Sequence, residues 1–293
     1  MPRGRATGAM DIMADEPAEP TAQPDKVAGD IAFARAVEIF NENRVTEAAD
    51  LMWEAKDMYS VDCGTESLEV ANACLELGAI LDKLHRFEEA MFELNTALRI
   101  RIRVFGDTHP CVGRVLDRQG LVYKGLGRLH DSLSKHEQAA SILREQSEGG
   151  TMTKEECIQW YSDAGATILN IANILYTQGK YDLALLRYKE ALNIRRKQQG
   201  PSAELGTACA QMGLANVYYS LARYPEALRE HEEVLAVRLK LLGRDSVNVA
   251  ASLVNIGSVL VMMNKSEEAL AKYKEALEIE VEIYGGVQNG GLG

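Results

Sequence analysis

One pattern of small residues recurs six times, and it limits the fold more than any other feature of the chain. A small residue is followed twelve positions later by a second, and seven positions after that by a third. The first members are Ala36, Gly78, Gly120, Ala172, Ala215 and Gly257, the second are Ala48, Ala90, Ser132, Ala184, Ala227 and Ala269, and the third are Ala55, Ala97, Ala139, Ala191, Val234 and Ala276. Neighbouring first members lie 42, 42, 52, 43 and 42 residues apart.

This spacing predicts stacked helical hairpins. Small side chains allow the backbones of two crossing helices to approach, so their fixed offsets mark fixed crossing points. A constant period of this length is typical of repeat arrays, in which each unit packs only on its neighbours. Three residues before each second small residue comes a bulky residue in five copies, and Ser266 in the sixth. We therefore predict an all-α solenoid of six antiparallel helix pairs.

The links between copies carry helix-boundary signals. Gly106, Gly200 and Gly243 lie where a helix is expected to end in a left-handed cap. Pro110 is predicted to begin the next helix, and Asp245-Ser246 offers an N-cap. Residues 99–105 alternate between charged and apolar types, which in isolation favours a strand. The stretches at the same repeat positions in other copies follow the helical periodicity, so we predict that residues 99–105 are helical too.

The repeat pattern sets the domain boundaries. Residues 1–27 are rich in Ala, Pro, Asp and Glu without periodicity, and are predicted to be a disordered acidic tail. The array is predicted over 28–285, with a longer link near 147–153 and a helix from about Lys154. The glycines from Gly285 onward predict a flexible, non-helical tail over 286–293. Without a polar capping helix, either the sixth hairpin presents an apolar edge to a partner or the sequence is part of a longer chain.

The phrases Lys180–Ala184 and Arg223–Ala227 resemble the tetratricopeptide repeat, with small residues at its eighth, twentieth and twenty-seventh positions. The longer unit of about 42 residues, the Gly106–Pro110 link and ends such as Ala97–Arg101 resemble kinesin light chains and nephrocystin-3-like proteins. The resemblance implies a right-handed superhelix that binds other proteins. Kinesin light chains usually carry heptads before the repeats, and none is visible here, so motor attachment is not expected.

In that architecture the first helix of each hairpin lines the concave face. The positions two before and one, four and five after the first small residue are then expected to face the groove. In the N-terminal half they hold Glu76, Asp82, Lys83, Arg118 and Lys124, and in the C-terminal half Asn170, Asn173, Tyr176, Asn216, Tyr219 and Asn255.

Within this set, the asparagines are the residues that most specifically indicate peptide binding. An asparagine amide donates and accepts hydrogen bonds, as the backbone of an extended peptide requires. Groove asparagines play that part in kinesin-light-chain-like repeats. The alternative is that these asparagines cap or bridge helices within the array. Copies four to six have no Lys or Arg at the groove positions, so a clamp for a terminal carboxylate is not expected.

Composition excludes several classes of function. The net charge of −11 opposes binding to nucleic acid or to anionic lipid. No run of about 18 apolar residues exists for membrane insertion, and the first 25 residues lack the apolar core of a signal peptide. The five cysteines have no metal-binding spacing and are interpreted as small reduced thiols. A cytoplasmic location follows, with association to the cytoskeleton or a cilium as an option.

No constellation in the sequence predicts catalysis, a metal or a cofactor, so the chain is not predicted to be an enzyme. His136-Glu137 and His231-Glu232 lack the second histidine of a zinc-protease helix. Both histidines are interpreted as packing between helices. The recurring Arg101, Arg195 and Arg238 are predicted to bind terminal carbonyls and neighbouring acids.

The leading hypothesis is therefore an adaptor or scaffold that binds a peptide segment of a partner protein in the groove. The alternative is a structural subunit of a large cytoskeletal or ciliary assembly. Such a subunit would use its convex faces and the open C-terminal edge, and it predicts self-association through the uncapped last repeat.

Overall fold

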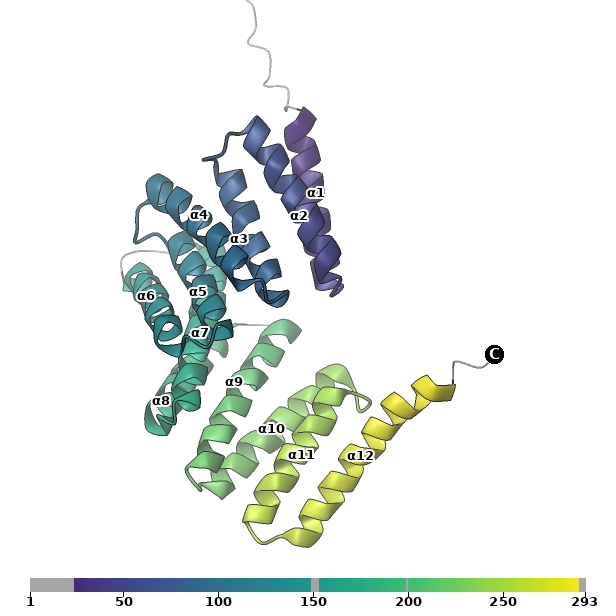
Figure 1. Cartoon of the computed structure of the whole chain (residues 1–293). Coiled ribbons are helices and arrows are strands. Elements are labelled where there is room, and N and C mark those ends of the chain that lie inside the picture. Colours follow the sequence, from purple (N-terminus) through teal and green to yellow (C-terminus); the bar gives the residue numbers. More distant parts are fainter. Residues whose placement is uncertain (1–23, 149–152, 199, 290–293) are drawn as a thin grey trace, which may run out of the picture.

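The computed structural model describes residues 24–148, 153–198 and 200–289, and these ranges contain twelve helices and no strand (Figure 1). The helices are α1 (Pro24–Asn41), α2 (Val45–Asp62), α3 (Leu68–Lys83), α4 (Phe87–Phe105), α5 (Pro110–Gly125), α6 (Leu129–Glu148), α7 (Lys154–Thr177), α8 (Tyr181–Arg195), α9 (Pro201–Ser220), α10 (Tyr224–Leu242), α11 (Val247–Met262) and α12 (Ser266–Asn289). Consecutive pairs form six hairpins that stack into a right-handed superhelical solenoid. The predicted all-α fold is confirmed.

The hairpin turns explain why the bulky residues recur. The second helix of every hairpin begins at the residue three before the second small position, from Val45 in α2 to Ser266 in α12. Two residues earlier, each turn contains one residue with a left-handed backbone. Gly127 and Gly179 adopt it without strain, whereas His85 (φ 58°) and Ala222 (φ 56°) adopt it against their steric preference.

All eighteen small positions are buried, as the crossing-point interpretation requires. In three hairpins a larger side chain, sixteen positions after the first small residue, lies directly against it. A Cβ atom added to Gly78 would lie 2.6 Å from Cγ of Leu94, and one added to Gly257 would lie 2.7 Å from Tyr273. The absence of a side chain at these glycines is what allows the two helices of the hairpin to approach.

Most of the predicted helix boundaries are confirmed. Pro110 begins α5, and the Ser246 hydroxyl caps α11. Gly106 and Gly243 end α4 and α10 with φ of 85° and 77°. Gly200 instead precedes α9 as its N-cap, because α8 already ends at Arg195. Residues 99–105 are the last turns of α4, so the helical prediction there was right.

Two predicted boundaries need correction. Helix α1 begins at Pro24, four residues before the expected start of the array. Helix α12 continues through Gly285-Gly286 to Asn289, so the prediction that these glycines cannot be helical was wrong. A glycine costs a helix only about 1 kcal/mol relative to alanine, which does not by itself end a helix that is already formed. The remaining parts of the predicted tails of 1–27 and 286–293, residues 1–23 and 290–293, lie outside the described residues.

The longer link precedes an extended first helix, as predicted. Helix α7 begins at Lys154 and has 24 residues, against 16 in α3 and α5. Thr153 caps it, and the side chain of Glu156 accepts a hydrogen bond from the Thr153 N–H in return. The additional N-terminal turns of α7 reach the wall of the first cavity described below.

Candidate binding groove on the first-helix side

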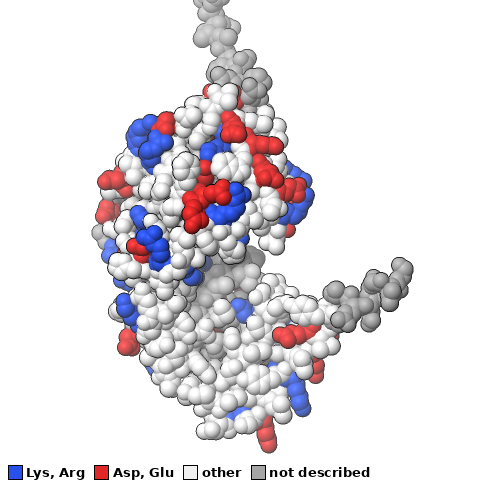
Figure 2. Space-filling view, viewed as in Figure 1, with Lys and Arg blue, Asp and Glu red and all other residues white. Residues whose placement is uncertain are grey.

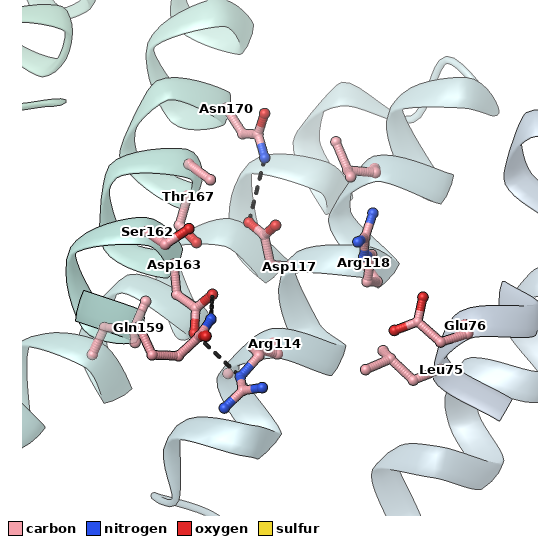
Figure 3. Close-up of a pocket in the computed structure, with 14 residues that line it drawn as sticks. Leu75, Glu76, Arg114, Asp117, Arg118, Gln159, Ser162, Asp163, Thr167 and Asn170 are labelled. Atoms are coloured by element: carbon pink, nitrogen blue, oxygen red, sulfur yellow. Dashed lines mark hydrogen bonds and ion pairs between the residues drawn. The ribbon is translucent and has the colours of Figure 1, made fainter. Parts of the chain in front are cut away.

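A cavity of about 520 Å³ lies between α3, α5 and α7, all of which are first helices of their hairpins (Figure 3). Its polar lining consists of Glu76 from α3, Arg114, Asp117 and Arg118 from α5, and Gln159, Ser162, Asp163, Thr167 and Asn170 from α7. Three successive hairpins thus contribute to one polar, charged depression.

Hydrogen bonds and ion pairs hold one wall of this first cavity. Arg114 Nε lies 3.2 Å from Asp163 Oδ2, and Gln159 Nε2 donates to Asp163 Oδ1 at 2.8 Å. Burial raises the pKa of Asp163, and the positive charge of Arg114 opposes that rise. Asn170 Nδ2 donates to Asp117 Oδ1 at 3.4 Å. The wall is therefore partly preorganised by contacts between α5 and α7.

A second cavity of about 380 Å³ follows along the same side of the array. Lys124 from α5, Asn173 and Tyr176 from α7, Tyr188 from α8 and Asn216 from α9 line it. Tyr188 Oη donates to Asn173 Oδ1 at 2.6 Å, which occupies one lone pair of that oxygen and directs the amide NH₂ of Asn173 toward a ligand. The half-buried Asn216 side chain makes no hydrogen bond with any described residue, so its donor and acceptor are both available.

The predicted groove residues divide into three groups. Glu76, Arg118 and Asn170 line the first cavity, and Lys124, Asn173, Tyr176 and Asn216 line the second. Asp82, Lys83, Tyr219 and Asn255 line neither of these cavities.

The tyrosines of the predicted set also have a structural role. Tyr219 packs against Tyr224 with ring centroids 5.7 Å apart, and Tyr176 packs against Tyr181 at 5.6 Å. In each pair, the second ring belongs to the first residue of the following helix. These contacts close the hairpin turns, so Tyr219 is held by its own hairpin.

Sequence reasoning predicted Glu76 but missed the two aspartates of the first cavity. Asp117 and Asp163 lie three and nine positions before the first small residue of their copies, outside the four positions predicted to face the groove. Gln159, Ser162 and Asp163 belong to the first turns of the extended α7. A signal did exist, because the longer link already predicted extra helix here.

The charge of the groove changes along the array. Lys83, Arg118 and Lys124 lie around Asp82, and none of these three cations forms an ion pair within the described part of the chain. Burial raises the pKa of Asp82 although these cations oppose the rise. Helix α11 has no charged residue, and Figure 2 shows few charges over α9 and α11. The positions predicted to face the groove are thus charged in the first half of the array and largely neutral in the second.

Two of the three recurring arginines, Arg101 and Arg238, join hairpins rather than bind acids, whereas the buried Nε of Arg195 has no hydrogen-bond partner among the described residues. Arg101 donates to the Cys111 carbonyl at 2.8 Å and to Asn72 Oδ1 at 2.9 Å. Arg238 donates to the Asn248 carbonyl at 2.9 Å and to Ser252 Oγ at 2.8 Å. The carbonyl partners belong to the first turn of the next hairpin, so the predicted pairing with acids was wrong for these two arginines.

The two histidines pack between helices, as predicted. His136 Nδ1 lies 2.7 Å from Asp117 Oδ1, and a Cβ atom added to Gly120 would contact the ring. Burial lowers the pKa of His231 to about 4, and the Arg238 charge adds to this effect. His231 is therefore neutral in the folded chain at pH 7.

The described ranges lack two features that would point to a membrane or to a metal ion. None of their helices combines the length and the apolar character that crossing a bilayer requires. No group of three or more His, Cys, Asp or Glu side chains in these ranges is arranged to hold a metal ion.

Six hairpins joined at buried small residues, with cavities along their first helices, define a helical-repeat scaffold. The chain belongs to the tetratricopeptide repeat family. One sequence profile of that family matches residues 69–145 and 206–279, which is more than half of the chain. A second profile of the same family matches residues 165–197.

Two curated relatives come from Arabidopsis thaliana. Protein KINESIN LIGHT CHAIN-RELATED 1 is 27% identical over 156 residues, which are 53% of this chain and 24% of that protein. Protein KINESIN LIGHT CHAIN-RELATED 2 is 28% identical over 145 residues, which are 50% of this chain and 20% of that protein. The matched region thus spans a quarter or less of these relatives.

Two solved structures show the same fold. The first is BtubC (BKLC) from P. vanneervenii, with a TM-score of 0.63 and 19% identity over 88% of this chain and 93% of that chain. The second is a putative kinesin light chain from Podosopora anserina with nearly identical repeats. Its TM-score is 0.57 at 17% identity, over 72% of this chain and 95% of that chain. The predicted resemblance to kinesin light chains thus agrees with the names of these relatives and of the second structure, and the two structures show the fold of the chain.

Proposed function

We propose that this chain is a protein-interaction scaffold that binds an extended peptide segment of a partner along its first helices. The observation that carries the proposal is the position of the two cavities. They follow one another along the first helices of the hairpins, and seven of the residues predicted to face the groove line them. The tetratricopeptide fold supports a role in binding proteins, and no catalytic role or cofactor is proposed.

The mechanism would rest on preorganised amide groups. Asn216 offers a free donor and acceptor, and Asn173 offers an NH₂ group whose orientation Tyr188 fixes. Together they would pair with the backbone N–H and C=O groups of a peptide. A rigid array loses little conformational entropy on binding, so such hydrogen bonds add to the net affinity. The charged first half of the groove would then favour particular side chains of the ligand.

The test uses peptides selected from a random displayed library on the full chain, with affinities measured by calorimetry. Asn216→Ala is expected to weaken the selected peptides about 5- to 10-fold, because each lost hydrogen bond contributes about 1 kcal/mol. Asn193→Ala is the matched control, because Asn193 is an exposed asparagine on the second helix α8. Equal affinities for Asn216→Ala and the wild type would refute the groove assignment.

A second candidate is a structural subunit of a large cytoskeletal or ciliary assembly. The exposed apolar side chains of α12, among them Leu270 and Leu277, favour it because they offer a surface for a neighbouring subunit. Self-association through this surface would follow, and light scattering of the purified chain tests it. The names of the curated relatives support a cytoplasmic location near the cytoskeleton. Fractionation with microtubules from cell extracts would test that location.

A further inference from the structure

The first cavity contains a carboxylate at a repeat position that is apolar in every other copy. Asp117 lies three residues before Gly120, the first small residue of its hairpin. The residues at that position in the other five copies are Phe33, Leu75, Leu169, Met212 and Val254. Packing of the array therefore does not require a charge here, and a charge removed from water costs free energy unless partners compensate it. The position of Asp117 thus points to a role in binding.

The contacts of Asp117 engage only one of its two carboxylate oxygens. His136 Nδ1 lies 2.7 Å from Oδ1, and Asn170 Nδ2 donates to the same oxygen at 3.4 Å (Figure 3). No hydrogen bond or ion pair within the described ranges reaches Oδ2. His136 is fully buried, so it fixes the carboxylate from the protein interior and leaves Oδ2 available to a ligand in the cavity.

Thr167 adds an unpaired hydroxyl group to the same cavity. It lines the cavity although the residue is only 1% exposed. Three other helical threonines, Thr96, Thr177 and Thr207, donate to the carbonyl four residues earlier. The Thr167 hydroxyl makes no hydrogen bond with any described residue. A buried hydroxyl without a partner costs free energy, so the cavity suits a ligand that hydrogen-bonds there.

The charges of the cavity are arranged by depth. The side chains of Asp117 and Asp163 are each only 17% exposed, whereas that of Arg114 is 43% exposed. Arg118 is exposed as well, and Glu76 is half-buried. Because Arg114 pairs with Asp163, the carboxylates of Asp117 and Glu76 have Arg118 as the remaining cation of the lining. Three acids and two arginines leave one negative charge uncompensated, which a single cationic group would neutralise.

We propose that the first cavity binds the side chain of a Lys or Arg residue of the peptide ligand, with Asp117 Oδ2 as its counter-ion and the Thr167 hydroxyl as a further acceptor. This inference rests on the proposed function, because the peptide backbone would pair with Asn173 and Asn216 in the second cavity. Asn170 and Asn173 are three residues apart on α7, about 5 Å along the helix axis. An extended residue spans about 3.3 Å, so a peptide of a few residues reaches both cavities.

The alternative ligand is an acidic side chain that pairs with the arginines. It would bind near the solvent, where Arg114 already has a partner and water screens the interaction. A basic side chain would instead meet Asp117 deeper in the cavity, where charges interact more strongly. The cavity of about 520 Å³ is large enough for a long side chain.

The test selects peptides from the random displayed library on the full chain and, in parallel, on Asp117→Asn. Peptides selected on the wild type are expected to carry Lys or Arg at one fixed position, and those selected on the variant to lack this preference. Replacing the basic residue by Gln is expected to weaken binding to the wild type about tenfold in calorimetry. The same replacement is expected to weaken binding to Asp117→Asn by less than about twofold, because the counter-ion is already absent.

A second variant and a matched control keep the test independent of folding. Thr167→Val removes a hydroxyl that is unbonded in the free chain, so it is expected to retain the urea midpoint and to weaken the basic peptide about fivefold. Asp107→Asn makes the same change of net charge at an exposed link residue outside the cavity. It is expected to leave the tenfold ratio between the basic and the Gln peptide unchanged.

The outcomes separate this inference from the proposed function. Selected peptides that Asn216→Ala weakens, but that lack a basic residue or bind Asp117→Asn with the same tenfold ratio, would overturn the inference and leave the proposed function intact. Selection of Asp or Glu at the fixed position would overturn it as well, because the arginines would then receive the ligand. Peptides whose basic residue depends on Asp117 but that ignore Asn216→Ala would refute the role of the amides instead.

Discussion

His231 makes the stability of the array depend on pH, and the dependence can be isolated with one substitution. Its imidazole is buried between the helices of the fifth hairpin, and burial with the nearby Arg238 lowers the pKa to about 4. The ordinary pKa of 6.5 applies in the unfolded chain. Between these two values the unfolded state binds more protons than the folded state, so stability falls as the pH is lowered.

The magnitude follows from the difference between the two pKa values. A shift of one unit corresponds to about 1.4 kcal/mol, so the full loss below pH 4 is about 3 kcal/mol. At pH 4.5 most of this loss, about 2.5 kcal/mol, is already present, whereas above pH 7 it is negligible. His231→Leu removes the titrating group and keeps a side chain that the repeat already tolerates, because Leu94 occupies the same repeat position in the second hairpin.

The assay is urea unfolding at pH 7.5 and pH 4.5, followed by circular dichroism, for the wild type and His231→Leu. Carboxylates also titrate over this range, but they do so in both chains. The loss of unfolding free energy in the wild type minus the loss in the variant therefore reports on His231. The wild type is expected to lose about 2.5 kcal/mol more than the variant over this range. If both chains lose the same stability, the buried neutral histidine is not responsible and the reasoning fails.

Three further substitutions test the packing. Ala222→Gly should raise the free energy of unfolding by about 0.5–1 kcal/mol, since it relieves the left-handed backbone of an alanine; a lower free energy of unfolding in urea would contradict this. Glu93→Ala should cost about 3–5 kcal/mol in urea unfolding, because Lys56, 2.7 Å away, loses its buried partner; a cost below 1 kcal/mol would refute it. Arg238→Met should speed hydrogen exchange in α11 and α12, because the Asn248 carbonyl loses its donor; unchanged exchange would argue against this role.

Much of the fold could be predicted because a solenoid is defined by local periodicity. The small residues and the turn residues recur at fixed offsets, so each helix boundary is encoded within a few residues of itself. The starts of α5, α7 and α11 at Pro110, Lys154 and Val247 were predictable for this reason. The end of α12 was not, because helix propagation from a packed hairpin outweighed the poor propensity of two glycines.

The candidate site was predicted less completely. Repeat position alone identified Asn173 and Asn216 as equivalent, yet only Asn173 has its oxygen bound by a neighbouring hydroxyl. The difference arises because Tyr188 follows Asn173 by fifteen residues, whereas His231 follows Asn216 at the same distance. The acidic lining from Asp117 and Asp163 depended on the length of α7 and on which hairpins enclose the cavity.

The sequence by itself determined the number of hairpins, the points at which helices cross and the positions of most turns, since these are set by side-chain size and backbone preference close along the chain. Only the tertiary structure decided which polar groups remain free, because hydrogen bonds such as that between Arg238 and the Asn248 carbonyl join different hairpins. The same holds for the last hairpin. Whether Leu277 is core or surface depends on what packs beside it, which its own sequence does not specify.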